Sequence, residues 1–302
     1  MKIIFFGTSQ FAVPTLEILE NLPHMEILAV VTQPDKPAGR GKLLTEPPVK
    51  TTAKKFGLKI LQPKDKTELK ENLKNTSADF FIVVSYGMIL PKEILKIPKY
   101  GAINVHGSLL PKYRGASPIQ ECLLNGDKET GVSIMKMDEK LDHGPIYMIK
   151  RIKITNDNAQ SLTKSLSRLA AATLAVALEE IVQADLQPIP QNEDKATYCR
   201  KIKKENGKID FSAKTAEEIA NMTKAYTPWP SVFTTFKGKK IKLTEADFSP
   251  EQADKSPGTF FLDNGILKIS TKKGTLLPKK LQMEGKKEVD AKSFINGYRN
   301  ML

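Results

Sequence analysis

The sequence predicts an α/β domain with a doubly wound sheet, followed by a smaller β domain. Up to about residue 184, apolar strand-like runs alternate with helix-like segments. From residue 231 onward, short strand-like runs are separated by Gly and Pro, which is typical of a small barrel. A chain of 302 residues is also long for a single hydrophobic core and suits two domains.

The first elements follow in the order strand, helix, strand. Residues 2–6 (KIIFF) form an apolar run, residues 11–21 repeat apolar side chains with helical spacing, and residues 27–32 form a second apolar run. This order predicts two parallel strands joined by a helix. Residues 78–85 (ADFFIVVS) are apolar on both faces, which is typical of a buried parallel strand.

The alternation continues through the rest of the first domain. Further strands are predicted over residues 101–106, 131–137 and 146–153, and helices over residues 48–57, 66–74, 116–125 and 158–184. Together these elements predict an open, Rossmann-like doubly wound sheet over residues 1–188. Ligand sites in such sheets collect at the carboxyl ends of the strands. Gly7 is not part of a G-x-G-x-x-G pattern, so the dinucleotide fingerprint is absent.

The sequence pattern changes after residue 183. Prolines and a run of charged residues predict a linker over residues 189–205. Residues 206–302 are expected to form a small OB-like β-barrel with one helix over residues 214–225. Its strands are predicted over residues 231–236, 239–244, 258–262, 265–270 and 275–282.

Charge and cysteine content narrow the classes of function. The chain has 47 Lys+Arg and 34 Asp+Glu, a net charge of +13, which favours a polyanionic partner, nucleic acid before an acidic membrane. The last 97 residues are the more basic part per residue, and Lys237, Lys239 and Lys240 form one cluster there. A surface that follows a nucleic-acid backbone is favoured over a solvated lysine-rich face. The two cysteines, Cys122 and Cys199, exclude a disulfide framework and a thiolate zinc site.

Targeting signals are not found in the sequence. The first apolar run ends at Gly7, which is too short for the core of a signal peptide, and no stretch approaches the ~20 apolar residues of a membrane span. A cytoplasmic location is therefore expected.

The predicted strand over residues 101–106 carries the most informative polar side chains. Asn104 and His106 lie on one face by the alternation of a strand, at its carboxyl end. A structural, hydrogen-bonded histidine is the alternative to a catalytic one. The turn after residue 137 holds Asp138, Glu139 and Asp142, any of which could approach His106, unless the turn is merely a solvated acidic one.

An amide, an imidazole and a carboxylate together suit acyl transfer. The amide would donate to a developing oxyanion, the imidazole would donate or carry a proton, and the carboxylate would orient the ring or accept a proton. No Ser, Cys or Lys nearby has an activating base, so direct attack by a substrate amine is favoured over a covalent enzyme intermediate.

Two stretches resemble the signature of the folate-dependent formyltransferases: residues 101–120 (GAINVHGSLLPKYRGASPIQ) and residues 131–145 (GVSIMKMDEKLDHGP). The resemblance implies that Asn104, His106 and Asp142 are the catalytic residues and that 10-formyltetrahydrofolate is the formyl donor. No metal is expected, because the three histidines of the chain show no ligand spacing. His143 departs from the family, where a small residue is expected, and could perturb Asp142. The resemblance also implies a folate site formed by Ser108, Leu109, Leu110, Pro111, Tyr86, Gly87, Ile89, Asp138 and Leu141.

Over its whole length the chain resembles those members of the family that formylate methionyl initiator tRNA. Residues 33–50 are similar to an insertion that enters the tRNA acceptor arm, with Arg40 and Lys42 at its tip. The resemblance implies tRNA as partner, contacts from Lys237, Lys239 and Lys240, and a monomer. A sugar-nucleotide amine formyltransferase and a non-catalytic nucleic-acid-binding protein are the alternatives.

Overall fold

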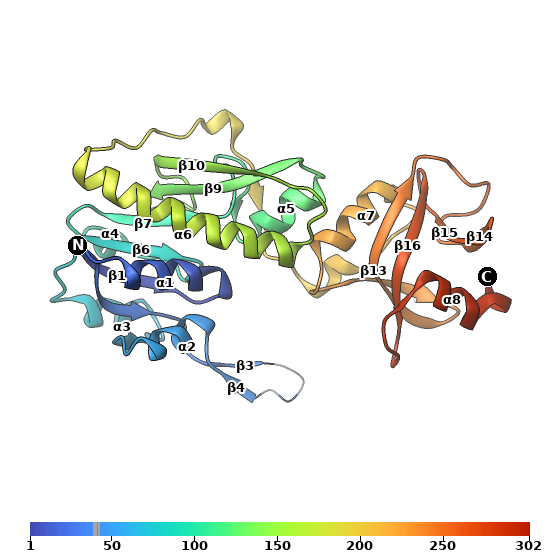
Figure 1. The fold of residues 1–302 in the computed structure, drawn as a ribbon, viewed down its shortest axis with the longest axis horizontal. Coiled ribbons are helices and arrows are strands. Elements are labelled where there is room, and N and C mark those ends of the chain that lie inside the picture. Colours follow the sequence, from blue (N-terminus) through green and yellow to red (C-terminus); the bar gives the residue numbers. More distant parts are fainter. Residues whose placement is uncertain (39–40, 42) are drawn as a thin grey trace. The chain divides into compact units, whose positions relative to one another are not determined.

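The chain forms two compact units in a computed structural model that describes residues 1–38, 41 and 43–302 (Figure 1). The first unit comprises Met1–Gly115, Glu129–Lys153 and Thr163–Tyr198. The second comprises Ala116–Lys128, Ile154–Leu162 and Cys199–Leu302. None of the described helices is long and apolar enough to cross a membrane.

A seven-stranded sheet organises the first unit. Its order is β10-β9-β7-β6-β1-β2-β5. The strands are β1 (Lys2–Gly7), β2 (Glu26–Val31), β5 (Ile60–Leu61), β6 (Phe80–Val84), β7 (Ala102–His106), β9 (Glu129–Lys136) and β10 (Ile146–Lys153). The strands that the sequence predicts are all present, with ends shifted by a few residues. The two-residue strands β5, β8 (Arg114–Gly115) and β11 (Tyr198–Cys199) are too short for a periodic signal.

The sheet is mixed rather than wholly parallel. The strands from β5 to β7 pair in parallel, whereas β9 runs antiparallel to β7, and β10 runs antiparallel to β9. Nine residues, 137–145, connect β9 to β10. A connection of this length joins antiparallel neighbours, because a parallel crossover needs a dozen residues or more. The α/β fold class is confirmed, with an antiparallel edge added to the parallel sheet.

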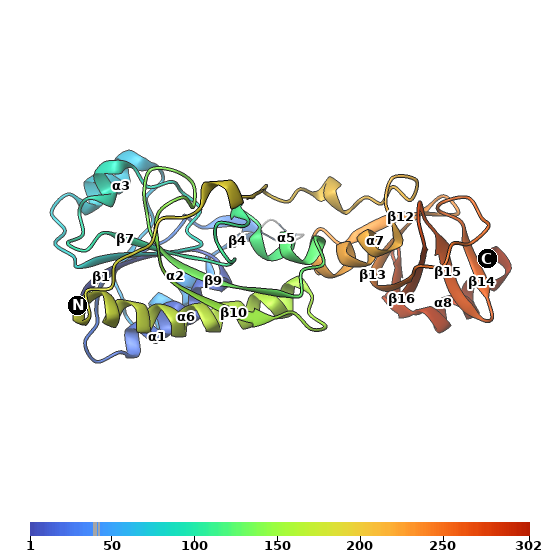
Figure 2. The same cartoon turned by 90° about the horizontal axis from the view of Figure 1, so that it is seen from above.

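Helices cover both faces of this sheet. They are α1 (Val13–Asn21), α2 (Pro48–Lys55), α3 (Lys66–Leu73), α4 (Lys92–Leu95) and α6 (Ala159–Gln183), and Figure 2 shows α3 on the opposite face from α1 and α6. On the face of α3, Phe6 and Phe81 of neighbouring strands pack with Leu69 and Ile94. The alternating apolar residues of β1 and β6 therefore have a helix partner on each side.

The pairing of β7 positions the polar end of that strand. Asn104 is opposite Val83 of β6 on one side and Met135 of β9 on the other, and His106 is opposite Ser133. The carboxyl ends of β6 and β7 therefore lie side by side. The connection that follows the antiparallel β9 contains Asp142, which contacts Asn104 and His106 at the end of β7.

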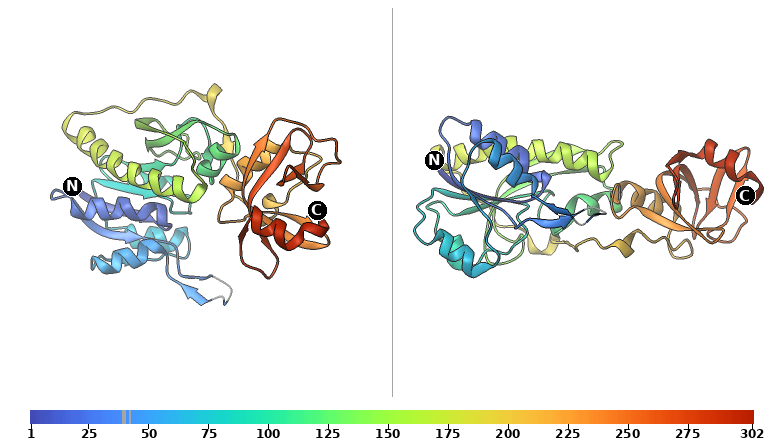
Figure 3. Two further views of the ribbon diagram at one scale, coloured as in Figure 1. Left: turned by 45° about the vertical axis from the view of Figure 1, so that its right-hand side comes forward. Right: turned by 90° about the horizontal axis from the view of Figure 1, so that it is seen from below.

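A small hairpin interrupts the chain between β2 and α2. β3 (Lys36–Ala38) pairs antiparallel with β4 (Leu43–Thr45), and Figure 3 shows these strands away from the main sheet of the first unit. Leu43 and Leu44 are exposed. The predicted insertion over residues 33–50 includes this hairpin, while Arg40 and Lys42 lie outside the described residues.

Antiparallel strands form the main sheet of the second unit, in the order β12-β13-β16-β15-β14, with β17 beside β16. The strands are β12 (Val232–Phe236), β13 (Lys239–Ser249), β14 (Phe260–Asp263), β15 (Ile266–Ser270), β16 (Thr275–Met283) and β17 (Val289–Asp290). The predicted β domain is confirmed. The pairings run from β12 to β14 along an open path, so closure into a barrel stays a prediction.

Three helices accompany this sheet within the second unit: α5 (Pro118–Leu124), α7 (Ala216–Ala225) and α8 (Ala291–Tyr298). Helix α8 was not predicted from the sequence. The Asp290 carboxylate accepts a hydrogen bond from the Ser293 amide at 2.7 Å, which caps the helix. Phe294 is buried with its ring 5.6 Å from that of Phe236. One buried aromatic in eight residues gives too weak a period for a prediction.

Candidate active site

Asn104, His106 and Asp142 meet at the carboxyl end of β7. Asn104 Nδ2 donates a hydrogen bond to Asp142 Oδ1 at 3.3 Å, and His106 Nδ1 lies 3.6 Å from Asp142 Oδ2. The side chains of His106 and Asp142 are only 7% and 14% exposed. An amide donor, an imidazole and a carboxylate are therefore in contact in a largely buried corner.

Of the three acidic residues in the turn after β9, the structure brings Asp142 to the histidine. Asp138 Oδ2 lies 2.5 Å from His143 Nδ1, and Glu139 Oε1 lies 2.5 Å from Lys92 Nζ. The alternatives that the sequence leaves open are thus separated by geometry, because the other two carboxylates are engaged by partners outside β7.

Backbone groups fix the His106 ring and the Asp142 carboxylate. His106 Nε2 lies 2.9 Å from the carbonyl oxygen of Tyr113. A carbonyl accepts but cannot donate, so Nε2 carries a proton and Nδ1 faces the carboxylate. The Gly115 amide donates to Asp142 Oδ2 at 2.8 Å. The backbone of residues 113–115 therefore orients both side chains.

The loop after β7 is held by a buried serine of β9. Ser133 Oγ donates to the carbonyl oxygen of Ser108 at 2.8 Å and accepts from the Leu110 amide at 3.1 Å. Ser108 Oγ donates in turn to the carbonyl oxygen of Lys112 at 2.6 Å. Ser108 and Leu110 are buried, while Leu109 and Pro111 are half-buried. These hydrogen bonds hold the backbone of the loop in place beside His106.

The segment after β6 contributes exposed apolar side chains and one buried aromatic. Ile89 is 66% exposed, and Gly87 is also exposed. On the turn after β9, Leu141 is 57% exposed. The Tyr86 ring is buried, 5.5 Å from the Phe6 ring, and burial raises the pKa of Tyr86 to about 12. Only the main chain of Tyr86 is therefore available at the sheet edge.

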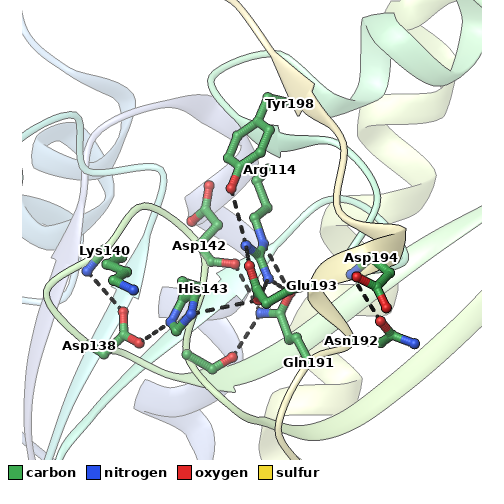
Figure 4. A network of polar contacts seen from close by, with 11 residues as sticks. Arg114, Asp138, Lys140, Asp142, His143, Gln191, Asn192, Glu193, Asp194 and Tyr198 are labelled. Carbon is green, nitrogen blue, oxygen red and sulfur yellow. Dashed lines mark hydrogen bonds and ion pairs between the residues drawn. The ribbon is translucent and has the colours of Figure 1, made fainter.

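A second polar cluster lies beside the first and was not found in the sequence analysis (Figure 4). Arg114, whose side chain is 1% exposed, donates to Gln191 Oε1 from Nε at 3.1 Å and from Nη2 at 2.8 Å. Its Nη1 and Nη2 also donate to the Glu193 carboxylate at 2.9 and 2.6 Å. Gln191 Nε2 donates to the carbonyl oxygens of Asp142 and Gly144 at 2.9 and 2.7 Å.

His143 belongs to this second cluster. Its Nδ1 contacts Asp138, and its Nε2 lies 3.6 Å from Glu193 Oε1. The ring that could have perturbed Asp142 is therefore engaged by two other carboxylates. Hydrogen bonds from Arg114 hold the pKa of the Glu193 carboxyl below its usual range, with a further contribution from the charge of His143.

The predicted nucleic-acid contacts of the second unit lie at the turn between β12 and β13. Lys237 and Lys239 are exposed, and Lys240 Nζ lies 3.9 Å from the centre of the Phe233 ring. Lys237 adopts a positive φ of 47° at the turn. Among residues 1–38, 41 and 43–302, no group of three or more His, Cys, Asp or Glu side chains is arranged to hold a metal ion.

Comparison with known proteins identifies the family. Residues 1–178 match the formyl transferase family and residues 201–299 match the formyl transferase C-terminal domain. The chain is 44% identical to the methionyl-tRNA formyltransferase of Caldicellulosiruptor saccharolyticus, with 99% of this chain and 97% of that protein aligned. It is 44% identical to that of Thermodesulfovibrio yellowstonii, with 98% and 95% aligned. The chain belongs to the methionyl-tRNA formyltransferase family.

A solved relative of the formyltransferases has the same fold. The N-formyltransferase from Helicobacter canadensis, solved with folinic acid and dTDP-3-aminofucose, aligns with 94% of this chain and 99% of its own length, with a TM-score of 0.69 and 21% identity. This likeness extends to the fold alone. The resemblance found in the sequence is confirmed by the full-length relatives, while the individual roles of the site residues stay predictions.

Proposed function

We propose that this chain transfers the formyl group of 10-formyltetrahydrofolate to the α-amine of methionine esterified to initiator tRNA. The observation that carries the proposal is the convergence of Asn104, His106 and Asp142 in a chain that aligns with methionyl-tRNA formyltransferases over nearly its whole length. Formyl transfer needs an oxyanion donor and a proton acceptor at one carbon, and this corner offers both.

The reaction begins with the amine. An α-amine has a reference pKa of about 7.7–8.0, so much of it is protonated at neutral pH and must lose a proton before it attacks. The nitrogen lone pair then adds to the formyl carbon, and the carbonyl oxygen becomes an oxyanion. The attacking nitrogen then gives up its second proton, and N10 of the folate takes up a proton as collapse of the intermediate breaks its bond to the formyl carbon.

Three side chains divide this work. Asn104 Nδ2 carries two hydrogens, one directed at Asp142 and one for the oxyanion. His106 Nε2 is bonded to the Tyr113 carbonyl, so His106 donates to the same oxyanion from a protonated Nδ1, the nitrogen beside the carboxylate. Asp142 orients the ring and accepts the amine proton through water. One oxyanion donor is commonly worth about 2.7–4 kcal/mol of transition-state stabilisation.

The folate would lie along the edge formed by two loops. Ser108, Leu109, Leu110 and Pro111 form one side, and the rigid bonding of this loop through Ser133 supports the assignment. The exposed side chains of Ile89 and Leu141 would cover the pterin and aminobenzoyl rings. Tyr86 would contact the folate through its main chain. The remaining residues of this proposed pocket are Gly87 and Asp138.

The tRNA would be held by basic groups on exposed turns. Lys237, Lys239 and Lys240 would contact phosphates, and Arg40 and Lys42 would contact the acceptor end. In this proposal residues 1–188 carry out catalysis, residues 189–205 connect, and residues 206–302 bind tRNA. The enzyme would act as a monomer in the cytoplasm.

A formyl-transfer assay tests the proposal. The protein is incubated with 10-formyltetrahydrofolate labelled in the formyl carbon and with either methionyl initiator tRNA or an amino-sugar nucleotide. We expect label on the tRNA-bound methionine and none on the sugar. Label on the sugar alone would make the chain a sugar-nucleotide formyltransferase, and RNA binding without transfer to either acceptor would indicate a non-catalytic binding protein.

A further inference from the structure

Asp142 has a positive φ, a conformation that Asp adopts more readily than most residues with a Cβ but that is still uncommon. Its φ is +48°, in the left-handed region where a residue with a Cβ is uncommon. The residue lies on the connection between β9 and β10, outside both strands. Neighbouring groups must therefore stabilise this conformation, and the position of the carboxylate beside His106 depends on them.

One side chain binds the backbone on both sides of this turn. Gln191 Nε2 donates to the carbonyl oxygens of Asp142 and Gly144, at 2.9 and 2.7 Å. The Cβ position of Gly144 is closed, because a Cβ there would lie 1.9 Å from the carbonyl oxygen of Lys136. The turn is thus fixed between the edge of β9 and the Gln191 amide.

The orientation of the Gln191 amide is determined by Arg114. Arg114 can only donate, so the oxygen of the amide must face the guanidinium and the nitrogen must face the two carbonyls. All four hydrogen-bonding positions of the amide are then used. Arg114 is itself buried and paired with the Glu193 carboxylate. The guanidinium that orients the Gln191 amide is therefore held in place.

We propose that Gln191 is a positioning residue for the formyl-transfer reaction, which holds the backbone of Asp142 so that its carboxylate stays beside His106 and Asn104. The inference rests on the proposed function. The Gln191 amide reaches Asp142 through the main-chain carbonyl and not through the carboxylate, so its effect on the reaction passes through the position of Asp142. A misplacement of about 1 Å in such a site can cost about 100-fold in rate.

The substitution Gln191→Glu isolates the positioning hydrogen bonds. One carboxylate oxygen still accepts from Arg114, whereas the other now faces two carbonyl oxygens that it repels. Gln191→Met removes the same two donors without adding repulsion, and it also removes the oxygen that accepts from Arg114. We expect kcat of formyl transfer to fall about 10-fold or more in both variants. KM for folate and tRNA should stay within about twofold. The melting temperature of both variants should fall by a few degrees, because two carbonyls lose their donor, and circular dichroism should show that both stay folded at the assay temperature.

A neighbouring glutamine provides the control. Gln187 lies in the same segment and is exposed, and its amide donates to the backbone and side chain of Asp185. Gln187→Ala should leave kcat and both KM values unchanged. Wild-type kcat in both Gln191 variants would overturn the inference, as would a KM increase with unchanged kcat. Absence of formyl transfer in the wild type would instead refute the proposed function.

Discussion

The corner formed by Asn104, His106 and Asp142 in the first unit differs from the lysine-rich turn of the second unit in how its polar side chains are held. In the corner, buried polar groups are fixed by hydrogen bonds, as with Asp142, which accepts from Asn104 and from the Gly115 amide. At the turn, Lys237 and Lys239 are exposed to solvent. We therefore expect the rate of formyl transfer to depend on the distances between groups in the corner. The binding of tRNA should depend instead on the number of charges at the turn.

The largest effect is expected at the corner. Asn104→Ala, His106→Ala and Asp142→Ala should each lower kcat by about 100-fold or more, because each removes an oxyanion donor or a proton carrier. Steady-state kinetics of formyl transfer measures this, and circular dichroism checks that the fold is retained. Glu139→Ala, from the same turn as Asp142, should retain wild-type kcat, since its carboxylate pairs with Lys92. Near-normal turnover in all three corner variants would refute the assignment.

The next effect contrasts a buried arginine with an exposed one. Arg114 is buried and bonded to Gln191 and Glu193, so Arg114→Ala should lower the free energy of unfolding by about 2–4 kcal/mol. Arg151 is 59% exposed and pairs with Glu129 at 2.7 Å, so Arg151→Ala should cost about 1 kcal/mol or less. Urea unfolding of both variants measures the difference. Equal losses would mean that the buried cluster stabilises the fold no more than a surface ion pair does.

Much of the fold could be predicted because its long elements have clear periods. The buried strand over Phe80–Val84 is apolar at every position, and the helix over Ala159–Gln183 repeats Ala and Leu along its 25 residues. The antiparallel edge was not predicted, because the apolar pattern of β9 does not encode its direction. The helix α8 was missed since it is short and buries one large side chain.

The corner was predictable only in part for a physical reason. Asn104 and His106 lie two residues apart on one strand, so alternation alone places them together. Asp142 lies on a separate connection far along the chain, and only the fold brings it to them. Gln191 and Glu193 fall in a polar segment whose composition is typical of a linker, so their role depends wholly on where that segment runs.

The lysine-rich turn should show a smaller and salt-dependent effect. Replacing Lys237, Lys239 and Lys240 together by Ala should weaken tRNA binding roughly 10-fold and leave kcat at saturating tRNA unchanged. The slope of log Kd against log salt should fall by about 0.7–0.9 for each phosphate that the variant no longer neutralises. Filter binding over a range of salt concentrations measures the slope. Lys268→Ala is the control, because Lys268 Nζ pairs with Asp263 at 2.6 Å. A changed kcat with an unchanged slope would contradict this role.

The smallest effect is expected at Glu193, where the buried cluster reaches the surface. Its side chain is 53% exposed, and its carboxylate accepts from Arg114, which holds the pKa of Glu193 below its usual range. A carboxyl with a lowered pKa in the folded state stabilises the protein above its unfolded-state pKa, near about 4.3, and loses this contribution as the pH falls through the folded-state pKa. Glu193→Gln should therefore lower the melting temperature by no more than about 2 °C at pH 7, and the difference from the wild type should be smaller at an acid pH below about 4. Thermal unfolding at both pH values measures it. A difference that stays the same on acidification would mean that the charge of Glu193 does not contribute to stability.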